Sequence, residues 1–433
     1  MNATSPETGF QKPFALPYQL GVYLAVNAVS DACLVVDGSD CVMPKADFLA
    51  GNHDLRSTLL APDGAHRVLC SMTGPLPQDE NHERKLAGLL GEVAASGRFG
   101  AVLVTGLPFL KLAGVDYEGV AAGVRAAAPV ADVPARSLEA DWLEGYDLAL
   151  EALARALPEP DRRKKRAGRP RVALAGYLYD RGERDHLANL AELRRLLVLA
   201  GVEPVCVFPS GGNFRELSAA LTADLVVSLP YGRRAAARLA ARSGARLLET
   251  GLPLGFKGTS AWLAAVRRAV GLKGGFPAEL AALERAAALE TAPALDALAH
   301  RNVVFAGDPY LFSAFSSFSA ELRLRPRAAL LCARARPLAA GLPGTLLFSP
   351  GTAEAAAAVR RLSGYAAPHL AVGNSFAVTE KFFPGLPFVE LGFPSYGHHC
   401  LGDEPFLGYA GARTLAGRLV NALRGGPRLP EAA

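Results

Sequence analysis

The stretch RPRVALAGYLYDRGERDHLANLAELRRLLVLAGVEPVCVF, residues 169–208, contains the pattern that decides the fold. Its apolar run VALA is typical of a strand buried on both faces of a parallel sheet. After a polar turn, LANLAELRRLLVLAG places leucines at helical spacing and ends at Gly201, where a helix C-cap is expected. A second apolar run, PVCVF, follows at once. This order predicts a βαβ unit with parallel strands.

Two other segments, 99–129 and 301–333, begin in the same way with a strand-like run, a short Gly/Asp turn and an amphipathic helix. Further strand-like runs follow the second and third segments, for example TADLVVSL, PHLAVGN and PFVELGF. The pattern predicts an α/β protein of three Rossmann-like domains with doubly wound, mostly parallel sheets. The expected domains are 1–160, 168–275 and 298–425, separated by a charged, proline-rich linker at 156–171 and a helical bridge at 276–301.

The composition excludes several classes of protein. The chain has 433 residues and a formal charge of +5, with no basic face carrying interleaved aromatics, so nucleic-acid binding is not expected. The N-terminus has no secretory pattern, and no apolar run reaches the roughly 18 residues that a membrane span requires. The six cysteines form no CxxC pair, which favours a reducing cytoplasm over a disulfide-stapled secreted fold.

The nucleotide motifs of α/β proteins are missing from the sequence. Neither GxxxxGK[ST] nor a strand-coupled GxGxxG occurs, so the chain is not expected to hydrolyse a nucleotide or bind a dinucleotide in the usual way. Binding sites are instead expected at the carboxyl ends of strands and between domains.

Short motifs in order along the chain resemble those of the nitrogenase component 1-type oxidoreductases. They are DGSDC (37–41), VLCSMTG (68–74), VTGLPFLKLAGVDYEGV (104–120), VEPVCVFPSGGNFRELSAALTADLVVS (202–228), LPLGFKGTSAWLAAV (252–266), AVGNSF (371–376), GLPFVELGFPSYGHH (385–399) and FLGYAGARTLAGRLVNAL (406–423). The resemblance covers roughly residues 17–425. It implies three Rossmann-like domains, pairing with a second subunit, and electron supply from a separate ATP-hydrolysing iron–sulfur protein. The missing P-loop fits that division of labour.

The resemblance also implies that Cys41 ligates an iron–sulfur cluster. A thiolate in the loop after a parallel strand is near backbone N–H groups that stabilise its charge. The alternative is a small buried hydrophobe, although the polar residues 37–40 beside it do not suit one. Cys70 is either a second ligand or a core cysteine. Because a cubane needs four ligands, we expect a [4Fe–4S] cluster shared across an interface with a homologous subunit.

Several positions depart from the nitrogenase pattern. The family's first cysteine would fall near FALPYQL (14–20), where there is none, and Leu107 stands in place of another. These departures favour a single [4Fe–4S] cluster over an eight-iron cluster. Ser228 aligns with the cysteine that holds the family's active-site cofactor, which argues against a firmly held iron–molybdenum cofactor.

The tripeptide His398–His399–Cys400 follows a strand-like run, close to the position of the family's cofactor histidine. Three soft or borderline ligands in a row suggest that His398 or His399, and with less support Cys400, contacts a substrate or metal. Consecutive residues in an extended stretch point in opposite directions, so only one or two can face a given site. The alternative is a loop that packs two domains together.

The segment GNHDLRSTL (51–59) offers two interpretations. His53 and Asp54 could donate or relay a proton during reduction, or GNHD could form a turn that caps a following helix. Asp47 could replace one thiolate as a cluster ligand.

Other features also have structural alternatives. The glycine-bearing loops PSGGNF (209–214) and GFKGT (255–259) line a pocket, with Lys257 and Arg233 facing an anion, or they are only tight βα turns. RRKKR (162–166) is a solvated linker or a docking site for an acidic electron donor. The remaining cysteines, Cys33, Cys206 and Cys332, lie in apolar runs typical of the core.

Together these features predict a nitrogenase-like component 1 subunit that reduces an unsaturated substrate, such as a tetrapyrrole, with electrons from an ATP-dependent iron protein. Cys41 and Cys70 would hold the cluster, and His398, His399 and His53 would serve the chemistry. Two alternatives remain: a scaffold for metal-cofactor assembly, and a catalytically silent partner subunit.

Overall fold

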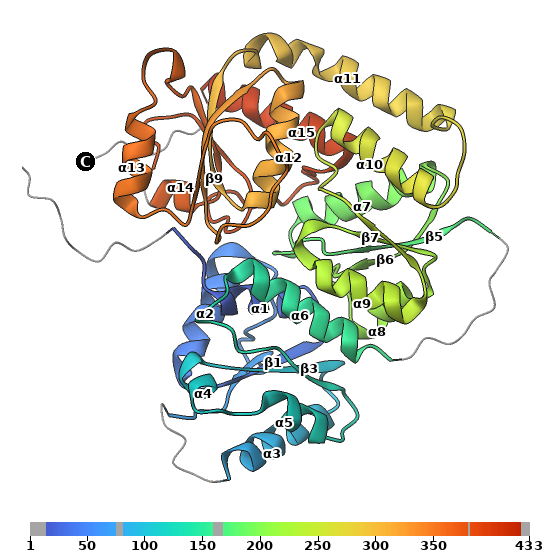
Figure 1. The fold of residues 1–433 in the computed structure, drawn as a ribbon, viewed down its shortest axis with the longest axis vertical. Helices are drawn as coiled ribbons and strands as arrows, with labels where there is room; N and C mark the ends of the chain where they lie inside the picture. The colour runs from blue at the N-terminus through green and yellow to red at the C-terminus, as the bar shows by residue number, and fades with distance from the viewer. Residues whose placement is uncertain (1–13, 75–80, 159–167, 380–381, 426–433) are drawn as a thin grey trace, which may run out of the picture.

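Three parallel sheets with helices on their faces make up the molecule (Figure 1). The computed structural model describes residues 14–74, 81–158, 168–379 and 382–425. All strand pairings in the three sheets are parallel. The predicted α/β class is therefore confirmed. RRKKR lies outside the described residues, and no helix within them is long and apolar enough to cross a membrane.

The first sheet has the strand order β2-β1-β3-β4. Its strands are β1 (Ala32–Asp37), β2 (Val68–Cys70), β3 (Ala101–Gly106) and β4 (Val130–Asp132). The helices of this part are α1 (Tyr18–Asn27), α2 (Met43–Asp47), α3 (His82–Ala95), α4 (Pro108–Leu112), α5 (Tyr117–Gly123) and α6 (Trp142–Ala156). Every residue of β1 and β3 is buried, as expected for strands covered on both faces.

The second sheet has the order β6-β5-β7-β8. Its strands are β5 (Arg171–Ala175), β6 (Glu203–Phe208), β7 (Leu225–Ser228) and β8 (Arg246–Glu249), and its helices are α7 (Arg184–Leu199), α8 (Phe214–Leu217), α9 (Arg233–Ser243) and α10 (Phe256–Ala269). Gly201 follows the end of α7 with a φ of 90°. A residue with a side chain rarely adopts that conformation, which is why glycine marks this helix end.

The third sheet has the order β11-β10-β9-β12-β13. Its strands are β9 (Asn302–Gly307), β10 (Arg325–Leu331), β11 (Thr345–Phe348), β12 (Leu370–Gly373) and β13 (Phe388–Glu390). The helices are α11 (Ala278–Leu298), α12 (Pro309–Glu321), α13 (Thr352–Arg360), α14 (Phe376–Thr379) and α15 (Gly408–Leu423). Helix α15 follows the last strand but packs against α7, α10 and α11, so the end of the chain joins the second and third parts (Figure 1).

Helices α1 and α6 pack at the centre of the molecule. All ten residues of α1 are buried. The helices approach closely at Gly21, where an added Cβ would lie 1.7 Å from the Trp142 carbonyl oxygen. From α6, Trp142 Nε1 donates to the Cys332 carbonyl at 2.9 Å, and the Tyr146 hydroxyl donates to the Tyr177 carbonyl at 2.8 Å. Helix α6 therefore connects the first sheet to the other two.

Residues 40–53 differ from the loop that their polar sequence suggests. They form the 3₁₀ helix η1 (Asp40–Val42), α2 and the π-helix η2 (Phe48–His53). Pro44 near the start of α2 is compatible with this because its missing N–H would have no helical partner there. No helix begins directly after Asp54, where the described chain continues as a turn and then β2, so the expected capping role there is wrong. Asp54 instead closes a local turn by accepting the Arg56 N–H at 2.9 Å.

Candidate functional site

The carboxyl ends of β1 and β2 bring the two predicted cluster-binding segments to one edge of the first sheet. The strands pair in parallel with Val36 opposite Cys70. Strand β1 ends one residue later, and η1, which contains Cys41, follows after two more. The Cys41 side chain lies outside the described part of the structure. Sheet register therefore places the backbone of η1 and Cys70 beyond the same edge.

Cys70 is half-buried and surrounded by backbone polar groups. Its thiol donates to the Gly38 carbonyl oxygen at 3.0 Å, and the Met72 N–H donates to its sulfur at 3.3 Å. Met72 has a φ of 59°, the left-handed conformation that non-glycine residues rarely adopt. An amide aimed at the sulfur stabilises negative charge on it, as a metal-binding thiolate requires.

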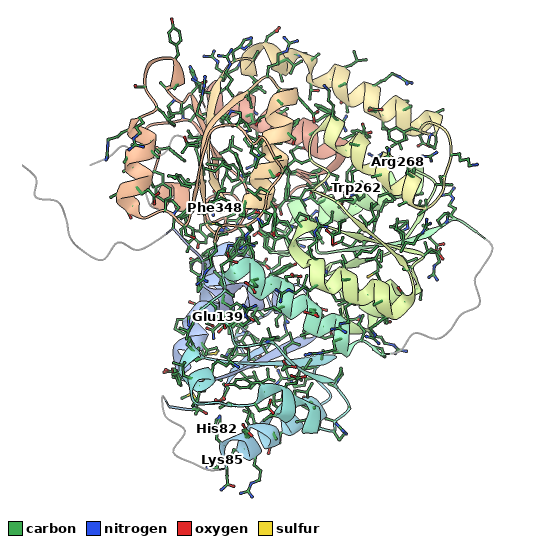
Figure 2. All side chains as sticks on the ribbon, viewed as in Figure 1. His82, Lys85, Glu139, Trp262, Arg268 and Phe348 are labelled. Carbon is green, nitrogen blue, oxygen red and sulfur yellow. The ribbon has the colours of Figure 1, made fainter. Side chains whose placement is uncertain are left out.

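A buried carboxylate beside Cys70 holds this edge together. Asp37 is fully buried and accepts hydrogen bonds from the hydroxyl groups of Ser71 at 2.6 Å and Tyr117 at 3.0 Å. The third partner is His82 Nε2 at 2.8 Å, from the start of α3 (labelled in Figure 2). Burial, and then Asp37, raise the pKa of Tyr117, so its hydroxyl keeps its proton. The sequence reasoning missed this network; a lone acid ending an apolar strand was the available signal.

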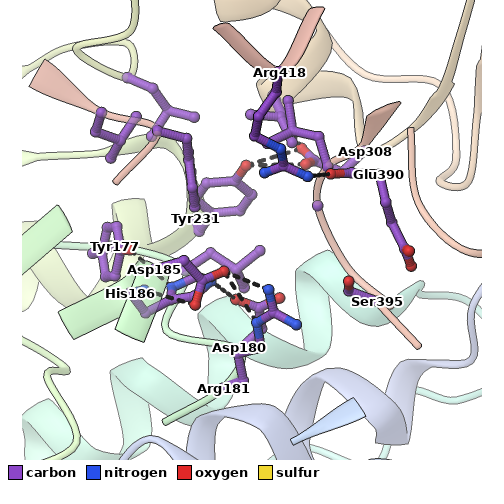
Figure 3. Close-up of a pocket in the computed structure, with 17 residues that line it drawn as sticks. Tyr177, Asp180, Arg181, Asp185, His186, Tyr231, Asp308, Glu390, Ser395 and Arg418 are labelled. Carbon is purple, nitrogen blue, oxygen red and sulfur yellow. Dashed lines mark hydrogen bonds and ion pairs between the residues drawn. The ribbon is translucent and has the colours of Figure 1, made fainter. Parts of the chain in front are cut away.

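The second candidate site is a cavity of about 30 Å³ between the second and third parts of the chain, which we call the central cavity (Figure 3). It lies beyond the carboxyl ends of β5, β7, β9 and β13, where ligands bind in open α/β sheets. The polar side chains that line it are Tyr177, Asp180, Arg181, Asp185, His186, Tyr231, Asp308, Glu390, Ser395 and Arg418. None of these was predicted from the sequence, because they come from segments far apart in the chain.

A chain of buried titratable groups runs along one wall of this cavity. Asp180 lies 2.7 Å from His186 Nε2 and 3.4 Å from His53 Nε2. His53 Nδ1 accepts the Ser395 N–H at 3.0 Å, which leaves Nε2 to carry a proton towards Asp180. His186 Nδ1 lies 2.8 Å from the Tyr177 hydroxyl. The predicted residue His53 is thus fully buried and adjoins the cavity through Asp180 and Ser395, which both line it.

Asp180 and His186 shift each other's pKa. Burial works against both charged forms, but the attraction to His186 holds the pKa of Asp180 below its ordinary value. Against the lowering effect of burial, Asp180 and Asp185 raise the pKa of His186. The geometry therefore favours a charged Asp180–His186 pair.

A second pair of opposite charges lies beside the first. Arg181 contacts Asp185 at 2.5 Å and Glu183 at 3.5 Å. Across the cavity Asp308 accepts from the Tyr231 hydroxyl at 3.1 Å and from the first N–H groups of α12. Burial raises the pKa of Asp308 to about 6 despite these hydrogen bonds.

The predicted residues His398, His399 and Cys400 lie on the segment between β13 and α15 and do not line the cavity. His399 Nδ1 lies 2.8 Å from Glu183, and His398 Nε2 lies 3.1 Å from Glu404. Cys400 is buried, and its N–H donates to Glu183 at 2.8 Å. Through His399 and the Cys400 N–H this segment contacts Glu183, next to the start of α7, while the imidazole of His398 and the thiol of Cys400 lie close to Glu404.

Arg233 lines a separate cavity of about 310 Å³, together with Arg234, Arg334 and Arg336. Its guanidinium donates to the carbonyl oxygens of Ser228 and Thr250. Lys257 does not line this cavity, so the two predicted anion contacts are not brought together there. Ser228 is fully buried, and its hydroxyl has no partner among the described residues. Asp47 ends α2.

Comparison with known families identifies the class of protein that this fold and these sites define. A family model of the nitrogenase component 1 type oxidoreductases matches residues 81–424. The chain therefore belongs to the nitrogenase component 1 type oxidoreductase family, as its motifs predicted.

Similar proteins include subunits of two different enzymes. The chain is 27% identical over 311 residues to a nitrogenase molybdenum-iron protein beta chain from Frankia alni, a match covering 65% of this chain and 58% of that one. It is 31% identical over 198 residues to subunit N of a light-independent protochlorophyllide reductase from Roseiflexus sp. (strain RS-1), covering 45% of this chain and 43% of that one. The chain thus spans about half the length of these relatives.

Solved structures share the whole fold. A structure of nitrogenase Cp1 at pH 6.5 superimposes with a TM-score of 0.79 at 15% identity, covering 98% of this chain and 95% of that one. A structure of the same protein at pH 5 gives 0.65 at 13% identity, with 98% and 90% covered. At these identities the likeness concerns the fold alone.

Proposed function

We propose that this chain is a redox-active, nitrogenase-like subunit of the reducing cytoplasm. It pairs with a homologous subunit, shares a [4Fe–4S] cluster with it through Cys41 and Cys70, and receives electrons from a separate ATP-dependent iron–sulfur protein. Its substrate is an unsaturated molecule reduced next to the central cavity. The observation that carries the proposal is the common edge of β1 and β2, beyond which Cys70 and the segment of Cys41 lie.

The donor set at this edge supports a shared cluster. One chain offers two cysteines there, while the other cysteines of the described residues, Cys33, Cys206, Cys332 and Cys400, are buried elsewhere. A cubane takes four ligands, so a second subunit must supply the rest. The Met72 N–H already donates to the Cys70 sulfur. Ser71, which lies between these two residues, is held in place by its hydrogen bond to Asp37. When bound, the cluster would store and pass on single electrons.

Exposed apolar side chains at the same edge support a subunit interface. Met72 follows β2, and Leu112 ends the helix after β3; their side chains are 70% and 76% exposed. A contiguous exposed apolar patch is typical of a surface that another protein covers, and we propose that these two side chains belong to such a patch. In Figure 1, α2 and α4 lie on the same side of this part of the molecule.

The central cavity supports reduction coupled to proton uptake. His186 and Asp180 line it, and His53 adjoins Asp180, so the wall can hold protons close to a bound substrate. A space of about 30 Å³ holds little more than a water molecule. A tetrapyrrole is far larger, so such a substrate would require the domains to open or a second subunit to complete its site. The His398 carbonyl contacts Arg181, which lines the cavity, whereas His399 contacts Glu183, which does not line it.

Anaerobic purification with iron and sulfide analysis and EPR tests the proposal. The chain should be produced with its homologous subunit, as wild type and as Cys41→Ala, Cys70→Ala and the control Cys206→Ala. We expect about one cluster per pair of subunits in wild type and in the control, and its loss in the other two variants. The reduced cluster should form on addition of an ATP-dependent iron protein and ATP.

The same experiment separates the alternatives. Wild-type protein without iron, with and without its partner, would overturn the proposal and favour a silent subunit. Substoichiometric metal that is passed on to another protein, without turnover, would instead indicate an assembly scaffold.

A further inference from the structure

Three metal-binding side chains lie together on the segment between β13 and α15. His398 Nε2, Cys400 Sγ and a carboxylate oxygen of Glu404 all lie within 4.8 Å of one another. His398 and Glu404 are half-buried, and Cys400 is 1% exposed. We propose that these three side chains bind one divalent transition-metal ion of the zinc class. This site is separate from the cluster at Cys41 and Cys70 and does not depend on it.

The separations suit a tetrahedral ion. Bonds of about 2.0–2.3 Å from zinc to nitrogen, oxygen and sulfur place neighbouring ligand atoms roughly 3.3–3.8 Å apart. His398 Nε2 and Glu404 are already 3.1 Å apart, and the sulfur lies within 4.8 Å of both. We expect side-chain rotations to close the site. Three protein ligands leave the fourth position open to water or another ligand.

The neighbouring side chains of His398 and His399 point in opposite directions and contact different groups. Residues two apart in an extended stretch point to the same side, which brings His398 and Cys400 together. His399 points the other way and lies 2.8 Å from Glu183. The sequence suggested that only one or two of the three residues could share a site, and the geometry selects His398 and Cys400.

The backbone of the site is held in place before any ion binds. The His398 carbonyl oxygen accepts hydrogen bonds from Arg181 at 2.9 Å and from the Ser395 hydroxyl at 3.1 Å. Glu183 accepts the Cys400 N–H at 2.8 Å. Such supporting contacts keep ligands near their bound geometry and lower the entropic cost of binding.

The charges around the site match a divalent ion. Arg181 and Arg418 face Cys400, and Glu183, Asp185 and Glu404 surround the same point. Two guanidinium groups against three carboxylates leave one negative charge, and a metal-bound thiolate adds another. A dication therefore neutralises the cluster. Thiolate and imidazole ligands select zinc, iron or cobalt rather than magnesium or calcium.

The site would stiffen the junction of the second and third domains. Its ligands belong to the segment that leads into α15, and Glu183 and Arg181 tie that segment to the start of α7. Arg181 and Arg418 also line the central cavity (Figure 3). A bound ion would thus fix the position of two cavity-lining cations.

Cobalt titration tests the site directly. Metal-free protein carrying both Cys41→Ala and Cys70→Ala is titrated anaerobically with Co²⁺, and the d–d and thiolate-to-cobalt absorption bands are followed. We expect one equivalent with tetrahedral bands, displaced by Zn²⁺. Cys400→Ser should lose the thiolate band, and His398→Ala and Glu404→Gln should weaken binding at least tenfold. The matched control His399→Gln should bind like the parent, and circular dichroism checks that each variant is folded.

Two results would overturn the proposal: no cobalt binding by the folded parent protein, or an unchanged thiolate band in Cys400→Ser. Because the background lacks Cys41 and Cys70, neither result bears on the iron–sulfur cluster. Conversely, failure to find iron in wild type leaves the cobalt experiment intact.

Discussion

Asp180→Asn is the substitution that best probes the junction of the three parts of the chain. Asp180 is buried and faces two histidines, His186 at 2.7 Å and His53 at 3.4 Å, which come from different parts of the chain. Asparagine keeps the shape of the side chain but removes its charge. His186 is then buried without a counter-charge on this side and must give up its proton.

Removing one partner of a buried ion pair costs about 3–5 kcal/mol, because the remaining charge is left uncompensated. We expect Asp180→Asn to lower the free energy of unfolding by about 3 kcal/mol, since a neutral His186 relieves part of the cost. The matched control is Asp403→Asn, which breaks an exposed ion pair with Arg184, where both side chains are well solvated. Exposed pairs contribute about 0–1 kcal/mol.

The pH dependence carries a second signature of the pair. The pKa of Asp180 is lowered, so its contribution is present above the unfolded value of about 3.9 and is lost as the pH falls further. The pKa of His186 is raised, so its contribution is complete below about 6.5 and is lost as the pH rises through the folded value. The difference between wild type and Asp180→Asn should therefore be largest between about pH 4 and 6.5.

Urea denaturation followed by circular dichroism at pH 5.5 and pH 9 measures both effects. The double variant with His186→Gln should be little less stable than Asp180→Asn alone, because the pair is already broken. A loss below about 1 kcal/mol at pH 5.5, or a loss equal to that of Asp403→Asn, would refute the assignment of a charged pair.

Three further substitutions test other parts of the structure. Gly21→Ala should lower the thermal midpoint strongly, because its Cβ would overlap the Trp142 carbonyl, whereas Gly91→Ala on open α3 surface should be neutral or stabilising. Burial raises the pKa of Asp308 to about 6, so between about pH 4 and 6 the folded state holds a proton that the unfolded state has lost, and the free energy of unfolding falls as the pH rises. Asp308→Asn should remove this fall, which is on the order of 2–3 kcal/mol. Urea titrations at pH 4.5 and 7 measure it. Arg67→Met should cost about 3 kcal/mol or more in the same assay, because the buried guanidinium donates to four carbonyl oxygens of the first part of the chain. A loss under about 1 kcal/mol would contradict this.

Sequence patterns predicted the fold because their signals are local. Apolar runs such as VALA and NVVFA became buried parallel strands, and Gly201 ended its helix, since each depends only on neighbouring residues. Local sequence patterns predict the secondary structure of residues 40–53 less well. There the polar composition suggested a loop, but short helical turns satisfy the backbone.

The sequence predicts part of the site at the carboxyl ends of β1 and β2, but it does not predict the central cavity. The sequence points to Cys70 because cysteines are few and strand ends are predictable, but no local pattern shows that the carboxylate of Asp37 holds the loop of Cys70 in place. His53 lies more than a hundred positions from Asp180 and His186 in the sequence, and no local pattern marks its pairing with Asp180.

By itself, the sequence determined the α/β class, the alternation of strands and helices, and the family, because these are written in periodic and ordered motifs. Only the tertiary structure decided which polar groups meet: it turned His399 towards Glu183, grouped His398 and Cys400 with Glu404, and closed the cavity between two sheets. The physical reason is that burial and pairing of charges depend on how domains pack, and packing joins residues that the chain keeps far apart.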